Sequence, residues 1–170
     1  GNEETVAQAV AAYVVARNRA LAVDEDVSLR LGGRLPAWEA ASNLLCRTFG
    51  RGWLLARPLV DPLVRRLLRP HRPSVIDGNM ALGNWFTDEG DSDLLYKVNA
   101  DERAFCHLDL TCFDPVYDLA GLAADCKSDL LPNRLRRAYE GLTGERIDDE
   151  RWLLYQLVHL WNAQRLRCEE

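Results

Sequence analysis

The chain has 170 residues, of which 48% are apolar and 28% are charged, and its formal net charge is −5. This size and composition predict one soluble globular domain with a sizeable core. The negative charge argues against a general nucleic-acid binder. Because we find no long apolar run and no N-terminal secretory signal, we expect a cytoplasmic protein with no membrane partner.

Apolar residues recur at helical spacing in several stretches, and Pro or Gly residues separate these stretches. Arg17 falls on the apolar face of the first stretch, so we expect its stem to lie along the core and its head to reach water. Residues 24–31 fit a short helix. The predicted helices cover residues 3–21, 36–49, 62–68, 115–127, 132–140 and a last segment that begins after Asp148 and Asp149.

Short β-branched and aromatic runs between the helices predict strands at 74–76, 85–87, 94–98 and 104–108. The acidic, Gly-containing turn at 88–91 joins the middle two runs and predicts a β-hairpin. Lys97 alternates with strand residues, which is typical of a solvated edge charge. The predicted fold class is mainly α with a small β-hairpin, in a single domain. That domain has a helical part (1–73), a loop and hairpin part (74–113) and C-terminal helices (114–170).

Charge is unevenly distributed along the chain. The segment from Arg47 to Arg72 contains seven Arg residues and one acid, Asp61. The segment from Asp77 to Asp109 contains eight acids and only two basic residues, Lys97 and Arg103. The basic segment could attract a phosphate group, and the acidic segment that follows it could attract a cation. The simpler interpretation is two solvated faces that pair with or repel each other.

Five cysteines occur without a C-x-x-C pair, and an odd number is typical of reduced thiols in a cytosolic protein. Cys106, His107 and Cys112 are a conceivable zinc cluster, but the sequence offers no clear fourth ligand. Buried apolar thiols are the favoured interpretation.

Two motifs suggest chemistry rather than packing. Residues 77–84 read D-G-N-M-A-L-G-N and residues 114–120 read D-P-V-Y-D-L-A. The first is similar in spacing to the H-G-D-x-H-x-x-N catalytic loop of the aminoglycoside phosphotransferase and choline kinase group, and it matches in identity at Gly78 and Asn84. The second closely matches the D-P-x-x-D-L-A segment of that group. From residue 77 to about residue 165, the chain therefore resembles the C-terminal lobe of the kinase-like superfamily.

The resemblance implies magnesium, ATP and phosphoryl transfer to the hydroxyl of a small molecule. Asp77 or Asn79 would lie near the acceptor, and Asp118 would brace the loop by accepting backbone N–H bonds. We count Asn84 and Lys97 as candidate cofactor-binding residues. The candidate metal ligands are Asn84, Asn99, Asp101 and Asp109. Asp109 corresponds to the family's metal-binding Asp if the segment Leu108-Asp109-Leu110 aligns with the family's I-D-F segment.

The chain departs from the family pattern at the positions that carry catalysis and nucleotide binding in the family. Asn79 stands where the family has a catalytic Asp, and an amide does not accept a proton at neutral pH. No Gly-rich loop and no strand-borne Lys for the nucleotide phosphates are visible, so a missing N-lobe or a partner protein is expected. The alternatives are a catalytically inactive pseudokinase-like module that binds a partner protein, and an unrelated helical domain. A hairpin at 85–98 argues against a purely helical bundle.

Overall fold

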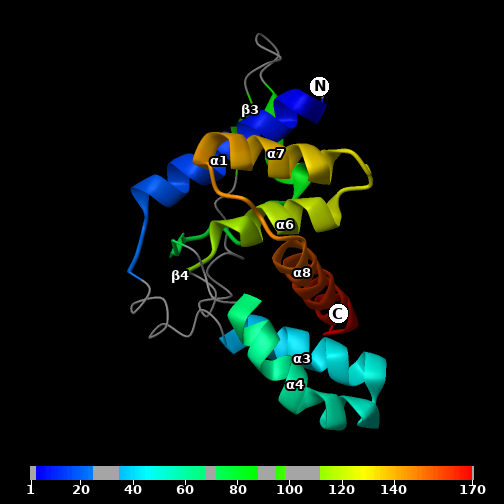
Figure 1. The fold of residues 1–170 in the computed structure, drawn as a ribbon. Helices are drawn as coiled ribbons and strands as arrows, with labels where there is room; N and C mark the ends of the chain where they lie inside the picture. Colours follow the sequence, from blue (N-terminus) through cyan, green and yellow to red (C-terminus); the bar gives the residue numbers. More distant parts are fainter. Residues whose placement is uncertain (1–2, 25–34, 68–71, 88–94, 99–111, 170) are drawn as a thin grey trace.

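The computed structural model describes residues 3–24, 35–67, 72–87, 95–98 and 112–169. These residues form α-helices joined by very short strands, which confirms the predicted mainly α class with a small β component (Figure 1). None of the described helices is long and apolar enough to cross a membrane. The helices are α1 (Glu3–Ala20), α3 (Leu35–Phe49), α4 (Arg51–Leu67), α6 (Pro115–Asp125), α7 (Leu131–Thr143) and α8 (Asp149–Glu169).

Two antiparallel strand pairs lie between the helices. Strand β1 (Ser74–Val75) pairs with β4 (Cys112–Phe113), and β2 (Trp85–Thr87) pairs with β3 (Leu95–Lys97). The second pair confirms the two strands of the predicted hairpin, with Trp85 opposite Lys97. The predicted turn at 88–91, the predicted strand at 104–108 and most of the predicted short helix at 24–31 lie outside the described residues.

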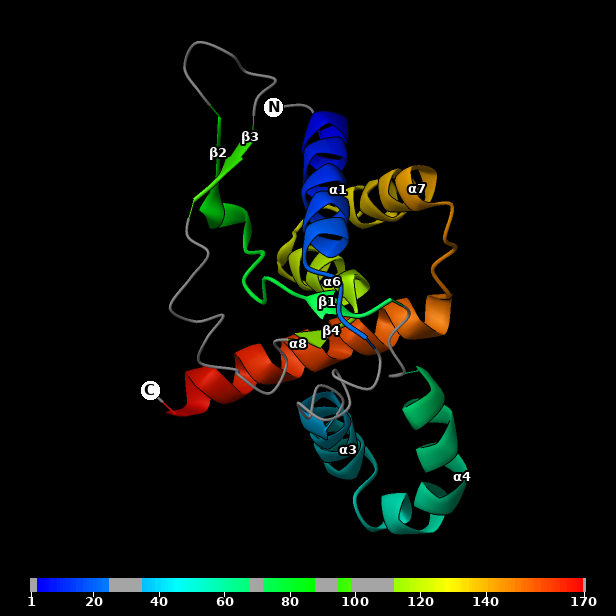
Figure 2. The same cartoon turned by 90° about the vertical axis from the view of Figure 1, so that its left-hand side faces the viewer.

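Helix α8 runs across the middle of the molecule and separates its two parts (Figure 2). On one side α1, α6 and α7 pack together and the β2–β3 hairpin stands beside α1; on the other side α3 and α4 form a helical pair that contacts α8. Within residues 1–73, α1 therefore packs on α6 and α7, whereas the α3–α4 pair contacts α8.

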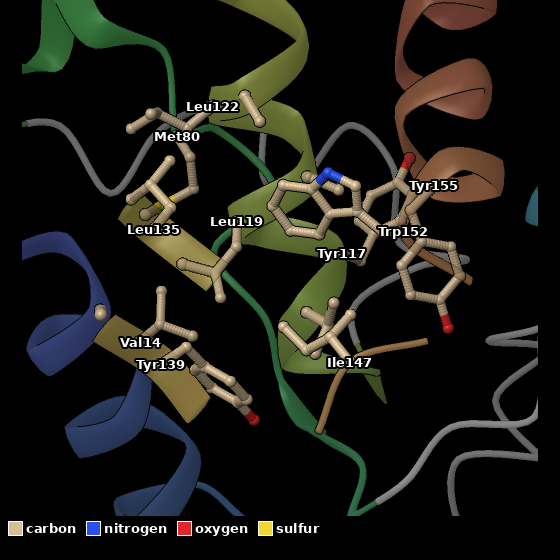
Figure 3. Close-up of a cluster of buried hydrophobic side chains, with 14 of the residues drawn as sticks. Val14, Met80, Tyr117, Leu119, Leu122, Leu135, Tyr139, Ile147, Trp152 and Tyr155 are labelled. Atoms are coloured by element: carbon tan, nitrogen blue, oxygen red, sulfur yellow. The ribbon is translucent and has the colours of Figure 1, made fainter. Parts of the chain in front are cut away.

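The hydrophobic core lies where α1, α6, α7 and the first turns of α8 meet (Figure 3). Helix α6 is apolar around almost its whole circumference, which is typical of a helix with neighbours on every side. Met80, from the loop after β1, is 4% exposed and lies among Leu122 and Leu135 in this cluster. The loop is thus anchored in the core by an apolar side chain.

The structure corrects two predicted helix boundaries. Helix α4 spans Arg51–Leu67 rather than 62–68, and it includes Pro58 and Pro62. Prolines usually end a helix, but α4 continues through both of them. Trp53 and Val64 of this helix are buried, at 3% and 5% exposed. Helix α7 continues through Gly141 to Thr143, and its C-cap Gly144 has a φ of 70°, the left-handed conformation that glycine adopts without strain.

Gly121 allows α6 and α8 to approach closely, and its replacement by Ala is expected to destabilise the fold. A Cβ atom at this position would lie 2.6 Å from Cε1 of the His159 ring. Overpacking of this kind typically costs about 1–3 kcal/mol of unfolding free energy, which urea denaturation would measure. Gly141→Ala is the matched control, because no atom lies within 4 Å of its Cβ position. Equal midpoints for Gly121→Ala and the unsubstituted chain would contradict the close approach.

Candidate functional site

The loop that begins at Asp77 is held at its entry by a carboxylate from α6. Asp118 accepts hydrogen bonds from the backbone N–H groups of Asp77 and Gly78, at 2.8 and 2.9 Å. Gly78 has a φ of 76°, a left-handed conformation that glycine adopts readily and that lets two successive N–H groups point to one carboxylate. The bracing geometry expected for Asp118 is confirmed.

Burial and charge shape the ionisation of Asp118. Asp118 is 2% exposed, and this burial raises the pKa of its carboxyl group from 3.8 to about 6. The two N–H donors act in the opposite direction, while the nearby charge of Asp77 raises the pKa further and Arg17 lowers it. At neutral pH Asp118 is therefore ionised and able to accept both bonds.

Asp77 itself is the centre of a buried polar cluster. One carboxylate oxygen lies 2.9 Å from Nζ of Lys97, and the other accepts a 2.5 Å hydrogen bond from the hydroxyl of Tyr13. The backbone N–H of Asn79 also donates to Asp77, at 3.3 Å. Asp77 is 1% exposed, so its negative charge is balanced inside the protein rather than in solvent. Asp77 as a catalytic residue stays a prediction.

Lys97 was expected at a solvated edge, and the structure shows this expectation to be wrong. Its side chain is only 4% exposed because the hairpin is folded against the loop and places Nζ beside Asp77. Trp85, opposite Lys97 in the hairpin, packs edge-on against the Tyr13 ring with centroids 5.5 Å apart. Aromatic packing and an ion pair thus join the hairpin to α1 and the loop. The nucleotide-binding role assigned to Lys97 stays a prediction.

Arg17, which is partly exposed, uses its head to bind the backbone that leads into the loop. Nε donates to the carbonyl oxygen of Val75 at 3.1 Å, and Nη2 donates to that of Ile76 at 3.3 Å. Nη1 lies 3.4 Å from the Tyr13 hydroxyl. Arg17 therefore satisfies the two carbonyl groups that precede the loop and ties α1 to it. The sequence contains one indication of this contact, namely that Arg17 is a charged residue within an apolar helical stripe.

The far end of the loop closes through Asn84. This residue ends a short 3₁₀ turn, η1 (Leu82–Asn84), and its side-chain amide donates to the carbonyl oxygen of Asn79 at 3.4 Å. Its own carbonyl accepts from the N–H of Val98 at 2.9 Å. Asn79 and Asn84 are both partly exposed. The structure thus brings together the two asparagines singled out in the sequence, both of them partly exposed.

Asp114 is the buried centre of a second polar cluster, at the start of α6. It caps α6 by accepting from the Val116 N–H at 3.0 Å, and it also accepts from Nη2 of Arg151 at 2.7 Å and from the Tyr155 hydroxyl at 2.9 Å. Glu145 binds the other terminal nitrogen of Arg151 at 3.0 Å. Asp114 and Arg151 are 0% and 3% exposed, so this cluster joins α6 to α8 and offers no surface to a ligand.

The pKa values of both partners of Asp114 are raised, for different reasons. Burial alone would lower the pKa of Arg151, but the attraction of the Asp114 carboxylate outweighs it and the pKa is raised above its usual value. Burial raises the pKa of Tyr155 well above its usual value, and Asp114 adds to this effect. Both shifts favour a charged Arg151 guanidinium and a neutral Tyr155 phenol beside Asp114.

Several sequence predictions fall outside this geometry. Asn99, Asp101 and Asp109, the other candidate metal ligands, lie outside the described residues, as do Cys106 and His107 of the conceivable zinc cluster. In the described part of the chain, no group of three His, Cys, Asp or Glu side chains is placed to hold a metal ion. His159 is hydrogen-bonded, as predicted, and partly buried: its Nε2 donates to the Tyr117 carbonyl at 2.9 Å.

No protein-family model, no curated protein and no solved structure matches this chain. The kinase-like relationship therefore stays a prediction that depends on the two motifs. The geometry adds that the motifs are physically connected, because Asp118 of the second motif holds Asp77 and Gly78 of the first.

Proposed function

We propose that the chain is the loop-bearing lobe of a kinase-like phosphotransferase. In the intact protein, the loop 77–84 would help to hold a magnesium nucleotide for phosphoryl transfer to a small-molecule hydroxyl. The observation that supports this proposal is the double hydrogen bond from Asp77 and Gly78 to Asp118, because a catalytic loop must be fixed before it can position reacting groups.

Within this proposal the partly exposed amides have defined tasks. Magnesium prefers oxygen ligands, and it is usually held by one or two carboxylates together with nucleotide phosphates. The amide oxygen of Asn84 would supply one ligand, and Asp101 or Asp109 the carboxylate. Asn79 would orient an acceptor hydroxyl by hydrogen bonding, since an amide cannot take its proton.

An inactive lobe that binds a partner is the second candidate, and one observation favours it. Asp77 is the sole carboxylate of the loop 77–84, and its two oxygens are occupied by Lys97 and Tyr13. A carboxylate held in this way is a poor proton acceptor for a substrate. Turnover by this chain alone is therefore expected to be weak or zero even if a nucleotide binds.

Isothermal titration with ATP tests the proposal. We expect weak binding that requires magnesium and is reduced at least about tenfold by Asn84→Ala, because one oxygen ligand is lost. Asn133→Ala, a change at an exposed position of α7, is the matched control and should leave the affinity unchanged.

Two results would count against nucleotide use by the loop. Absence of binding at millimolar ATP in the unsubstituted chain would exclude nucleotide use by the chain on its own and favour the partner-binding lobe. Binding that survives both chelation of magnesium and Asn84→Ala would place the nucleotide elsewhere.

A further inference from the structure

Helix α4 presents large apolar side chains to solvent on the side that faces away from the rest of the protein. Leu55 and Leu59 are 84% and 82% exposed, and Leu54 is 64% exposed. Residues four apart lie on the same face of a helix, so Leu55 and Leu59 form one ridge. Trp53 and Val64 are buried on the opposite face. Exposed leucines this close together are typical of an interaction surface.

Positive charge surrounds this ridge. The helical spacing of Arg51, Leu55, Leu59 and Arg66 places both arginines on the outward face, and both are exposed. Helix α4 contains four Arg residues and one acid, and that acid, Asp61, pairs with Arg57 at 3.4 Å. The ridge is therefore a basic amphipathic surface, although the whole chain has a net charge of −5.

The two prolines of α4 indicate what kind of occupant suits this face. Pro58 and Pro62 have no N–H, so the carbonyl groups of Leu54 and Pro58 lack the helical donor four residues later. A dry protein interface would bury these carbonyls without a partner, at a cost in free energy. The hydrated headgroup layer of a bilayer supplies water to carbonyl groups while it still admits leucine side chains to the acyl boundary.

From these observations we propose that α4 docks on an anionic lipid surface. Leu54, Leu55 and Leu59 enter the boundary between headgroups and acyl chains, and Arg51 and Arg66 lie against lipid phosphates. The proposal differs from the expectation of no membrane partner, which was drawn from composition, because composition averages the charge of α4 with the acids elsewhere in the chain. The helix lies on the surface and does not span the bilayer.

Sedimentation with lipid vesicles tests this proposal. The unsubstituted chain should bind vesicles that contain about one third phosphatidylserine in phosphatidylcholine, and added salt should weaken the binding. Leu55→Glu with Leu59→Glu should reduce the bound fraction at least about tenfold, because two acids replace the inserted side chains. Arg51→Glu with Arg66→Glu should produce a similar loss on anionic vesicles.

Leu153→Glu on α8 is the matched control, since Leu153 is 56% exposed but lies on another element. It should bind as the unsubstituted chain does, and circular dichroism should show the same helix content for all variants. Equal binding to pure phosphatidylcholine, or no binding to either vesicle, would overturn the proposal. A concentration-dependent dimer that Leu55→Glu dissociates would also overturn it, in favour of a contact between two copies of the chain.

Discussion

Replacement of Arg151 by Met is expected to lower the free energy of unfolding by about 3–5 kcal/mol, because it leaves a buried carboxylate without its cation. Asp114 is 0% exposed and has Arg151 as its charged partner, with Nη2 at 2.7 Å. The Tyr155 hydroxyl and the Val116 N–H would remain as donors, but neither supplies a positive charge. Urea denaturation followed by circular dichroism measures the effect.

Arg137→Met on α7 is the control for the loss of an Arg, since Arg137 is exposed and its replacement should change stability by less than about 0.5 kcal/mol. Asp114→Asn in the Arg151→Met background should restore part of the loss, because no unpaired charge then remains buried. If Arg151→Met were as stable as Arg137→Met, the ion pair would not be a main link between α6 and α8.

The second large effect is a pair of opposing pH dependences. Asp118 has a folded-state pKa of about 6 against an ordinary value of 3.8, so the folded state holds this proton more tightly than the unfolded state. Its contribution to stability is greatest below pH 3.8 and is lost as the pH rises through 6. Burial lowers the pKa of His159 from 6.5 to about 4, so its contribution is present above pH 6.5 and is lost as the pH falls through 4.

Each of these shifts corresponds to about 3 kcal/mol, and they act in opposite directions over the same pH range. The two contributions should therefore largely cancel between pH 4 and 6.5 in the unsubstituted chain. In Asp118→Asn only His159 remains, so stability should increase steeply with pH; in His159→Gln only Asp118 remains, so stability should decrease. Denaturant midpoints at half-unit pH intervals measure both slopes. Parallel profiles for the two variants would contradict the assigned pKa directions.

The sequence alone determined most of the helices and the hairpin. Helical spacing in 3–21 predicted α1, which ends at Ala20, and the acids at 148–149 predicted the start of α8. The strand pair at 85–87 and 95–97 followed from two β-rich runs on either side of a turn signal. These features depend on residues that are neighbours in the chain, and such local preferences are readable from sequence. The family resemblance that the D-P-V-Y-D-L-A motif carries also implied how Asp118 contacts the loop.

Tertiary structure decided how the candidate site is charged and held. The Tyr13 hydroxyl and Asp77 are 64 residues apart in sequence, and no local pattern predicts their hydrogen bond. Lys97 was expected in water because isolated charges usually lie there, but the Asp77 carboxylate makes burial of its side chain favourable. Arg17 stays partly exposed and hydrogen-bonds the backbone carbonyl of Val75, which no local pattern predicts. Helix α4 continues through Pro58 and Pro62 with Trp53 and Val64 buried against the rest of the protein. A long-range contact can outweigh a local preference because packing contributes more free energy than the propensity of a single residue.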